Sequence, residues 1–385
     1  MNADQLLFSS YTKNYTHPIL LVNKQQIIDN YNRFKQAFPR VEVNYAVKAN
    51  PDVNILATLM QVGSSFEVAS QHEIFLLKQA DKLNQIQNNQ PEFDFSRVVY
   101  SNPVRPQRYV ETAISHGINW FVVDSTCEID KVMEIDPKAN LYLRLIVPNN
   151  NSTFPLTGKF GVDVERATAL IEYCAEKLAY LRGVTFHVGS QCPNPQNWLD
   201  GIALARQVFK QMRKFGYIET FLDLGGGYPI EHSISVPTIF ELAEQINVEL
   251  DQFPEDVRII AEPGRYMISS AANMLCQVIS RSVRDGKPWF YFDTGVFHGM
   301  LEPSTSEEYK PKYITNYGYD DLVESAIAGP TCDSLDIVTR TQMLPRKLQS
   351  GDFVVQKSVG SYTSSYGTNF NGFPPPEVVF IDQSY

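Results

Sequence analysis

The chain has 385 residues, of which 43% are hydrophobic and 20% are charged; 33 basic and 43 acidic side chains give a formal net charge of −10. This composition is typical of a globular protein and excludes disordered, collagen-like and coiled-coil classes. The acidic balance argues against a nucleic acid or an anionic membrane as the main partner. No apolar run approaches the roughly 18 residues that a membrane span needs, and the first residues lack the basic and apolar regions of a signal peptide. We therefore expect a cytoplasmic protein.

Cysteine and histidine spacing limits the classes of site. The five cysteines are scattered, without a Cys-x-x-Cys pair, and the six histidines show neither His-x-x-x-His nor His-Glu-x-x-His spacing. A sparse, odd set of cysteines is typical of free thiols in a reducing compartment. We expect no dedicated metal site.

A short apolar run that ends in a polar residue or a glycine recurs eight times. The candidate strands are 41–48, 65–70, 98–103, 120–125, 141–147, 184–190, 221–227 and 258–264. Amphipathic helices are expected at 71–79, 165–178, 198–215 and 238–250. Eight strand–helix units predict an α/β fold of the (β/α)8 TIM barrel type, and a doubly wound sheet is the competing interpretation.

The pattern changes after Tyr266. Short strand-like runs at 274–280, 289–293, 352–357 and 378–381 are separated by glycine and proline, which predicts a β-rich C-terminal domain. We expect the barrel to cover 26–266, and residues 1–25 and 267–385 to form the β-domain, with an N-terminal strand contribution. The polar stretch 84–90 is interpreted as a surface insertion.

The ends of barrel strands are where catalytic residues gather. Lys48 and Glu262 stand at such ends, as do Glu67, Arg144 and His187. A lysine in a partly buried barrel mouth can form a Schiff base, although a lone strand-end lysine is more often a solvated one. His187 taken alone would more often be a satisfied core histidine.

Two glycine-containing loops also end strands, Gly225-Gly226-Gly227 and Gly264-Arg265. Consecutive glycines let backbone N–H groups converge on an anion, and a tight turn is the alternative. A lysine beside one phosphate site suggests pyridoxal 5′-phosphate. A carboxylate such as Glu262 beside the pyridine nitrogen would keep the ring a strong electron sink, which suits decarboxylation.

At these residues the sequence resembles the fold-type III, alanine-racemase-like, enzymes that use pyridoxal 5′-phosphate, and among them the ornithine decarboxylases. The matching stretches occur in order along nearly the whole chain. They are 45–51 (YAVKANP), 186–190 (FHVGS), 223–229 (DLGGGYP), 261–266 (AEPGRY), 329–336 (GPTCDSLD) and 370–373 (FNGF).

The resemblance implies a role for each matching position. Lys48 would carry the cofactor, His187 would stack on its ring, Glu262 would pair with its nitrogen, and Glu67 stands where the family usually has Asp near the ring hydroxyl. The residues implied to hold the phosphate are Ser190, Gly226, Gly227, Gly264, Arg265 and Tyr362, and Arg144 is a further cofactor-binding candidate.

The resemblance also implies a homodimer with shared sites. Cys332 would protonate the substrate carbon in the partner's site, Asp333 would bind the distal ammonium of a diamino acid, and Phe370 would line the pocket. Glu302 is a candidate second carboxylate for that amine.

The activity implied is decarboxylation of L-ornithine to putrescine. L-Lysine, 2,4-diaminobutyrate or a specialised diamino acid are alternative substrates, and a non-catalytic, decarboxylase-like regulator is a less favoured alternative. A regulator would be expected to lack the lysine or the Cys332–Asp333 pair, and both are present.

Overall fold

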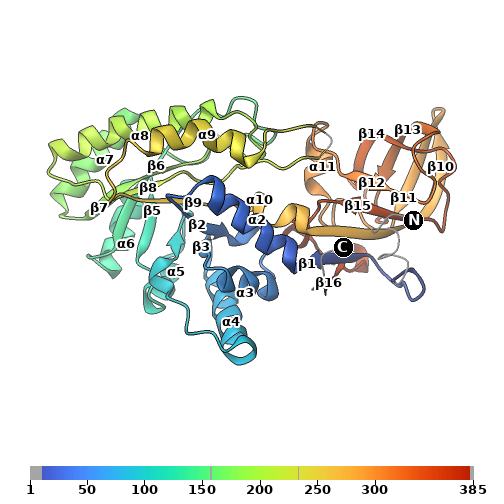
Figure 1. Cartoon of the computed structure of the whole chain (residues 1–385), viewed down its shortest axis with the longest axis horizontal. Coiled ribbons are helices and arrows are strands. Elements are labelled where there is room, and N and C mark those ends of the chain that lie inside the picture. Colours follow the sequence, from blue (N-terminus) through green and yellow to red (C-terminus); the bar gives the residue numbers. More distant parts are fainter. Residues whose placement is uncertain (1–10, 157, 233, 382–385) are drawn as a thin grey trace. The chain divides into compact units, whose positions relative to one another are not determined.

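The computed structural model describes residues 11–156, 158–232 and 234–381. The chain forms two compact units (Figure 1). One contains Ile28–Pro229 and Val236–Gly264. The other contains the described residues up to Ile27, the segment Ile230–Ser235 and the residues from Arg265 onward. The segment 230–235 thus lies within the barrel part of the sequence but belongs to the second unit.

The first unit is a closed barrel of eight parallel strands, which confirms the predicted (β/α)8 fold. The strands follow one another around the barrel from β2 to β9, and β2 closes the ring by pairing with β9. They are β2 (Val41–Ala46), β3 (Ser65–Val68), β4 (Val99–Tyr100), β5 (Trp120–Val123), β6 (Asn140–Leu145), β7 (Tyr180–Phe186), β8 (Phe221–Asp223) and β9 (Arg258–Ala261).

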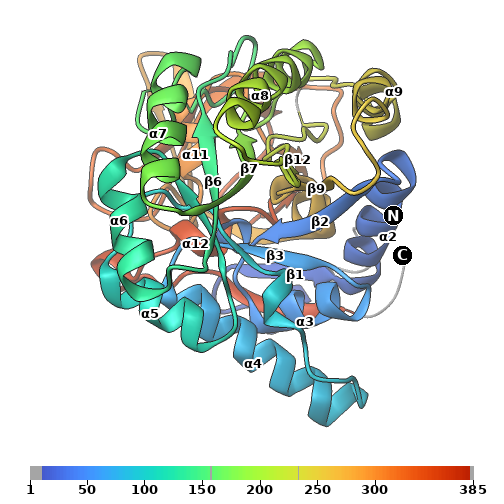
Figure 2. The ribbon, with the colours of Figure 1, turned by 90° about the vertical axis from the view of Figure 1, so that its left-hand side faces the viewer.

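Helices surround these strands, as the view from the barrel side shows (Figure 2). They are α2 (Lys24–Ala37), α3 (Val53–Gln61), α4 (Gln71–Asn88), α5 (Gln107–Ser115), α6 (Thr126–Ile135), α7 (Val164–Glu176), α8 (Gln196–Lys214) and α9 (Ile239–Leu250). The side chains of Ser70, Ser125, Asp163 and Thr238 accept hydrogen bonds from the first turns of α4, α6, α7 and α9. These caps satisfy backbone N–H groups that have no partner inside the helix, so these four helices begin where the sequence places a capping residue.

The stretch 84–90 is exposed from Gln85 to Gln90, as interpreted, but its first part is helical, because α4 continues to Asn88 and ends at Asn89 in the left-handed conformation. Asn84 is buried, and its Nδ2 donates to the Ala57 carbonyl at 2.9 Å. Its Oδ1 accepts from Gln61 Nε2 at 2.8 Å. A polar residue therefore joins α4 to α3, and hydropathy alone could not distinguish this role from a solvated loop.

The second unit is a β-rich sheet with the order β12-β15-β10-β11-β13-β14. Its elements are β1 (Ile19–Asn23), β10 (Ala272–Arg284), β11 (Lys287–Phe292), β12 (Lys312–Ile314), β13 (Leu322–Ala328), β14 (Ile337–Pro345), β15 (Phe353–Lys357) and β16 (Glu377–Ile381), with the short helices α10 (Arg265–Ile268), α11 (Leu301–Thr305) and α12 (Thr363–Tyr366). β1 pairs antiparallel with β10 and parallel with β16, which confirms the predicted N-terminal strand. Ile19, Leu21, Leu275 and Val355 form an apolar core there.

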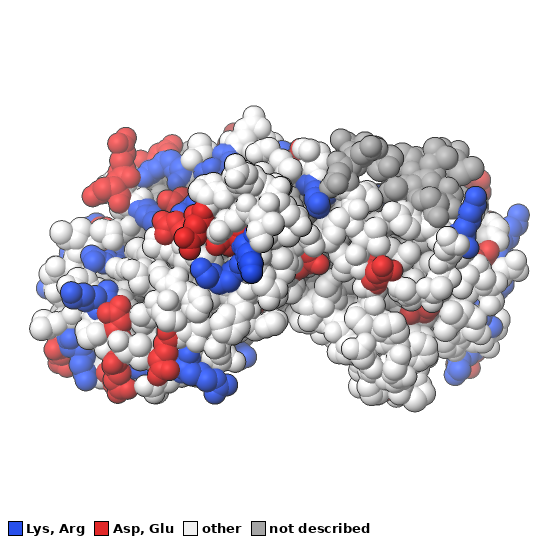
Figure 3. Space-filling view, turned by 90° about the horizontal axis from the view of Figure 1, so that it is seen from below, with Lys and Arg blue, Asp and Glu red and all other residues white. Residues whose placement is uncertain are grey.

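No helix in the described ranges is both long and apolar enough to cross a membrane. On the face in Figure 3, acidic and basic side chains lie interspersed over the barrel.

We predict that Asn84→Ala lowers the stability of the barrel. The substitution removes the donor to a buried carbonyl and the acceptor for Gln61, and leaving buried polar groups unpaired costs about 1–3 kcal/mol. Gln87→Ala, on an exposed turn of the same helix, is the matched control. Urea denaturation followed by circular dichroism measures both, and an equal midpoint for the two variants would contradict the structural role of Asn84.

Candidate active site

The barrel interior ends in a layer of polar side chains. Val99, Tyr142, Phe221 and Ile260 are fully buried and pack together inside the barrel. Successive side chains of a strand alternate between its two faces. The residues two positions further along are therefore directed to the same side. These are Ser101, Arg144, Asp223 and Glu262, and together they form the floor of the candidate site.

Lys48 stands at the same end of the barrel, in the short 3₁₀ turn Val47–Ala49 that follows β2. Its Nζ donates to Glu67 Oε2 at 2.5 Å, and the Glu67 side chain is 2% exposed whereas that of Lys48 is 43% exposed. Nearby Glu73 is also buried in part. Burial and the charge of Glu67 raise its pKa to about 7. One ammonium therefore faces several carboxyl groups.

Glu262 is the most strongly perturbed carboxyl group of this set. Burial raises its pKa well above the ordinary carboxyl range, and the charges of Asp223 and Glu67 raise it further. Ser101 Oγ donates to Glu262 Oε1 and lies 2.7 Å from the Tyr142 hydroxyl. Burial also raises the pKa of Asp223, to about 6, although Thr185 and the Gly225 N–H donate to its carboxylate. The site therefore contains more carboxyl groups than its lysine and arginine side chains can neutralise.

His187 is neutral in this setting. Burial lowers its pKa well below the ordinary histidine range, and the charges of Arg144 and Lys48 lower it further. The Gly189 N–H donates to His187 Nδ1 at 3.1 Å, so the proton of the neutral ring is assigned to Nε2. An uncharged, flat ring at this position can stack on an aromatic group.

These side chains surround a cavity of about 480 Å³. It is lined by Lys48, Glu67, Ala69, Ser101, Asn102, Pro103, Arg144, Pro155, Leu156, Lys159, Phe160, His187 and Glu262. The volume lies within the range of cavities that hold a small cofactor or substrate. The structure therefore brings together five predicted residues, Lys48, Glu67, Arg144, His187 and Glu262.

The glycine loop after β8 is shaped by close approach of the backbone. A Cβ on Gly226 would lie 2.8 Å from the Glu262 carbonyl oxygen and 3.1 Å from His187 Nε2. Gly227 has φ +101°, and a Cβ there would lie 2.3 Å from the Gly189 carbonyl oxygen. Only glycine fits these two positions, so the loop leaves open backbone next to His187 and Glu262.

Gly264 and Ser190 are the two remaining residues of the barrel that are candidates to bind the phosphate. Both lie close to other parts of the site. Gly264 approaches Ala46 and Ala49, which flank the Lys48 turn, and a Cβ on it would lie 2.8 Å from Ala49 Cβ. The backbone of Ser190 pairs with that of Phe154, which faces it from the segment that follows β6.

The geometry fits pyridoxal 5′-phosphate. A pyridinium N–H needs a buried carboxylate as its partner. Glu262 lies among other buried carboxyl groups, whose mutual repulsion a cation would reduce. The cofactor aldehyde needs an amine, which Lys48 supplies at the cavity wall. The flat ring of the cofactor needs a stacking partner, which His187 can provide. Its phosphate needs a loop with accessible backbone, which Gly226 provides.

Arg265 and Tyr362 lie in the second unit, where the guanidinium carbon of Arg265 is 5.1 Å from the centroid of the Tyr362 ring. Arg265 is buried, and both terminal nitrogens donate to Glu302, Nη1 to Oε2 at 2.9 Å and Nη2 to Oε1 at 2.5 Å. Nη1 also donates to the Tyr309 hydroxyl at 2.8 Å. Glu302 thus has a guanidinium partner within the second unit, and its role as a second carboxylate for the substrate amine stays a prediction.

Cys332, Asp333 and Phe370 also lie in the second unit. Cys332 is exposed, and both its N–H and its thiol donate to Asn371 Oδ1, at 3.2 and 3.3 Å. The Phe370 and Phe297 rings pack with their centroids 4.5 Å apart. Asp333 Oδ1 accepts from the Leu335 N–H at 2.9 Å, which fixes the turn that presents the carboxylate.

Three residues of these sites were missed in the sequence: Ser101, Asp223 and Asn371. Alternation from the buried Val99 would have identified Ser101 as an inward-facing residue at the end of its strand. The same period from Phe221 would have identified Asp223. Asn371 lies inside a matching motif, and nothing local to the sequence indicates that it reaches back 39 residues to Cys332.

A (β/α)8 barrel whose strand ends hold a lysine, a neutral histidine and an excess of buried carboxyl groups has the groups that an enzyme with an imine-forming cofactor needs. The residues 24–269 match the family model described as "Pyridoxal-dependent decarboxylase, pyridoxal binding domain". The chain belongs to this family of pyridoxal-dependent decarboxylases, whose cofactor is pyridoxal 5′-phosphate.

Individual relatives support this assignment. The chain is 32% identical to the lysine/ornithine decarboxylase of Selenomonas ruminantium over 95% of its own length and 90% of the relative. It is 34% identical to the ornithine decarboxylase of Schizosaccharomyces pombe, over 91% and 80% of the two chains. The crystal structure of lysine/ornithine decarboxylase from Vibrio vulnificus complexed with cadaverine matches with a TM-score of 0.88 and 28% identity, over the whole of both chains.

We predict that Glu262→Gln stabilises the cofactor-free protein and removes part of its pH dependence. A raised pKa means that the folded state holds the Glu262 proton more tightly than the unfolded state does, so stability falls as pH rises above the ordinary value of 4.5. A neutral amide avoids that cost, and a gain of about 1–2 kcal/mol at pH 8 corresponds to roughly 2–4 °C in Tm.

Differential scanning fluorimetry of the cofactor-free protein between pH 5 and pH 8 measures this effect. The exposed Glu244→Gln on α9 is the control. If Glu262→Gln were less stable than the parent chain at pH 8, the carboxyl group would not carry an uncompensated buried charge.

Proposed function

We propose that this protein decarboxylates a basic diamino acid, L-ornithine, to its diamine, putrescine. The observation that carries the proposal is the cavity that Lys48 lines together with the buried carboxyl groups of Glu67 and Glu262. The charge of Asp223 acts on Glu262 from beyond the cavity lining. Membership of the decarboxylase family supports the reaction, and relatives named for lysine and ornithine support the substrate class.

Each barrel residue has a defined task in this proposal. Lys48 holds the cofactor covalently through Nζ. Glu262 holds a proton on the pyridine nitrogen, for which its high proton affinity in the empty barrel prepares it. His187 stacks on the ring, and Glu67 and Arg144 orient it. When bound, the cofactor supplies the electron sink that accepts the bonding pair left by CO2.

The phosphate is proposed to bind at the glycine loops. Gly226, Gly227 and Gly264 offer backbone N–H groups without side chains in the way, and Ser190 offers a hydroxyl. Arg265 and Tyr362 are proposed to complete the set, with Glu302 as the residue that orients the Arg265 guanidinium.

Cys332 is proposed to return a proton to Cα after CO2 leaves, and Asp333 to bind the distal ammonium of the substrate. Cys332 is exposed and Asp333 is partly exposed in the single chain, and we propose that they act in the partner's site of a homodimer, where Phe370 lines the pocket. Asn371 Oδ1 accepts a hydrogen bond from the Cys332 thiol, which fixes the direction of the thiol. The five free cysteines support a reducing, cytoplasmic setting.

Substrate choice is tested by measuring CO2 release from L-ornithine, L-lysine and 2,4-diaminobutyrate side by side. We expect kcat/KM to be highest for L-ornithine and Lys48→Ala to lose about 10³-fold or more in kcat together with the visible absorption of the bound cofactor. Lys159→Ala, at the rim of the same cavity, should keep that absorption. Full activity in Lys48→Ala would refute the proposal, and turnover of none of the three amino acids by the parent chain would favour the non-catalytic regulator.

The shared site is tested by subunit mixing. If Cys332 serves the partner's cofactor, an equal mixture of Lys48→Ala and Cys332→Ala chains should regain up to about a quarter of the parent activity, because half of the dimers are mixed and each has one intact site. A mixture of Lys48→Ala and Lys48→Arg chains should regain none. Equal activity in the two mixtures, measured after subunit exchange, would contradict a site built from two chains.

A further inference from the structure

A chain of hydrogen bonds joins Glu262 to the barrel interior, and none of the proposed roles uses it. Ser101 Oγ donates to Glu262 Oε1 and lies 2.7 Å from the Tyr142 hydroxyl. A serine hydroxyl has one proton to donate. Because Ser101 gives that proton to Glu262, the Tyr142 hydroxyl is assigned as the donor to Ser101. The chain therefore runs in one direction, from Tyr142 through Ser101 to Glu262.

The two hydroxyl groups of this chain are buried and fixed by their surroundings. Tyr142 on β6 is fully buried, and its ring packs against Phe221 with the centroids 4.9 Å apart. Ser101 follows β4, and its N–H donates to the Val68 carbonyl of β3 at 3.1 Å. Burial raises the pKa of Tyr142 well above its ordinary value. The phenol therefore keeps the proton that it donates to Ser101.

Glu262 also shares a hydrogen bond with the carboxyl group of Asp223. Two carboxyl groups can share a hydrogen bond only when one of them is protonated. Both Asp223 oxygens already accept hydrogen bonds, Oδ2 from Thr185 Oγ1 at 2.7 Å and Oδ1 from the Gly225 N–H at 2.8 Å. These donors favour the ionised form of Asp223. Glu262 is therefore the protonated member of the pair in the cofactor-free barrel.

The Ser101 hydroxyl suits Glu262 in both of its protonation states. A protonated carboxyl group still has an oxygen that accepts from Ser101, and a carboxylate accepts more strongly. The bond to Asp223 requires a proton on Glu262 and is replaced by repulsion once that proton is gone. Ser101 is thus a contact that stays favourable when Glu262 becomes the anion that a pyridinium N–H needs.

We propose that Ser101, supported by Tyr142, is the positioning residue for Glu262. Its hydroxyl holds Glu262 Oε1 and stabilises the ionised carboxylate, so that Glu262 can pair with the ring nitrogen of the cofactor. This inference rests on the proposed function, because it assigns two further residues to the same site. Ser101 also lines the cavity, and a direct contact of its hydroxyl with the cofactor is the alternative that the test separates.

The test measures the affinity of the cofactor-free full chain for two ligands. One is pyridoxal 5′-phosphate, and the other is its analogue in which a CH group replaces the ring nitrogen. Ser101→Ala should weaken binding of pyridoxal 5′-phosphate about 10-fold, the value of one hydrogen bond to a charged group. It should change the Kd of the analogue by less than about twofold, because the analogue has no ring N–H to pair with Glu262.

Two further variants follow the chain of hydrogen bonds. Ser101→Thr keeps the hydroxyl and should recover most of the affinity for pyridoxal 5′-phosphate. Tyr142→Phe removes only the outer hydroxyl, so it should weaken pyridoxal 5′-phosphate by a smaller factor, about 2- to 5-fold, and leave the analogue unaffected. If Ser101→Ala does not fold, Tyr142→Phe supplies the same comparison of the two ligands.

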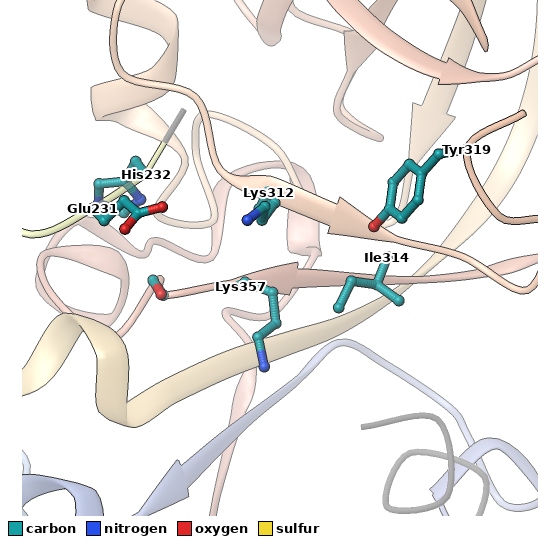
Figure 4. Close-up of a pocket in the computed structure, with 7 residues that line it drawn as sticks. Glu231, His232, Lys312, Ile314, Tyr319 and Lys357 are labelled. Atoms are coloured by element: carbon teal, nitrogen blue, oxygen red, sulfur yellow. The ribbon is translucent and has the colours of Figure 1, made fainter. Parts of the chain in front are cut away.

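Matched controls remove the same chemical groups elsewhere. Ser64→Ala deletes a buried hydroxyl just before β3, which donates to a backbone carbonyl at 2.7 Å. Tyr319→Phe deletes a phenolic hydroxyl of the second unit, which donates to the Tyr313 carbonyl at 3.0 Å. Figure 4 shows Tyr319 at a cavity of about 440 Å³ whose lining includes no member of the hydrogen-bond chain. Both controls should keep the parent Kd for both ligands.

Equal weakening of the two ligands by Ser101→Ala would overturn the proposal, because Ser101 would then act on the cofactor directly or through the fold. An unchanged Kd for pyridoxal 5′-phosphate would overturn it as well. In both cases the parent chain still binds the cofactor and the proposed function stands. A parent chain that does not bind pyridoxal 5′-phosphate would refute the proposed function itself. Far-UV circular dichroism of each cofactor-free variant checks that the barrel is folded.

Discussion

The barrel site contains more buried carboxyl groups than positive charges, and this imbalance determines the pKa values of the site. Lys48 is bound to Glu67, and Asp223 and Glu262 share the floor behind them, so the proton affinities of the deeper acids rise. In water these groups would ionise at no cost, but inside the barrel each charge needs a partner. The pyridinium ring that we propose Glu262 to bind would supply one. The same carboxyl groups would then keep the nitrogen of that ring protonated.

The closed barrel creates this arrangement from residues far apart in the chain. Ser101 and Glu262 are 161 residues apart and share a hydrogen bond, and Thr185 and Asp223 from neighbouring strands share another. Every strand ends at the same rim, so one inward-facing residue from each is enough to form the floor. The glycine loop after β8 then leaves room beside His187, because any side chain at Gly226 or Gly227 would meet backbone.

Much of this could be predicted from the sequence, since it depends on local patterns. The eight strands, the N-terminal strand of the sheet and the five residues around the cavity follow from alternation and from the places where strands end. Other features depend on contacts that no local pattern specifies. Asn84 is a polar residue that is buried because it joins two helices, and Asn371 reaches Cys332 only through the fold of the second unit. The pairing of Glu302, a candidate carboxylate for the substrate amine, with the buried Arg265 is likewise not indicated by any local pattern.

The central claim is that Nζ of Lys48 is the attachment point of the cofactor, and its most direct test is chemical. Borohydride reduction of the purified protein, followed by proteolysis and mass spectrometry, fixes the cofactor to the nitrogen that carries it. The account predicts a pyridoxyl group on the peptide that contains Lys48, at one per chain, and on no other peptide in comparable amount. A label on a different lysine, or no label on a protein that still decarboxylates its substrate, would contradict it.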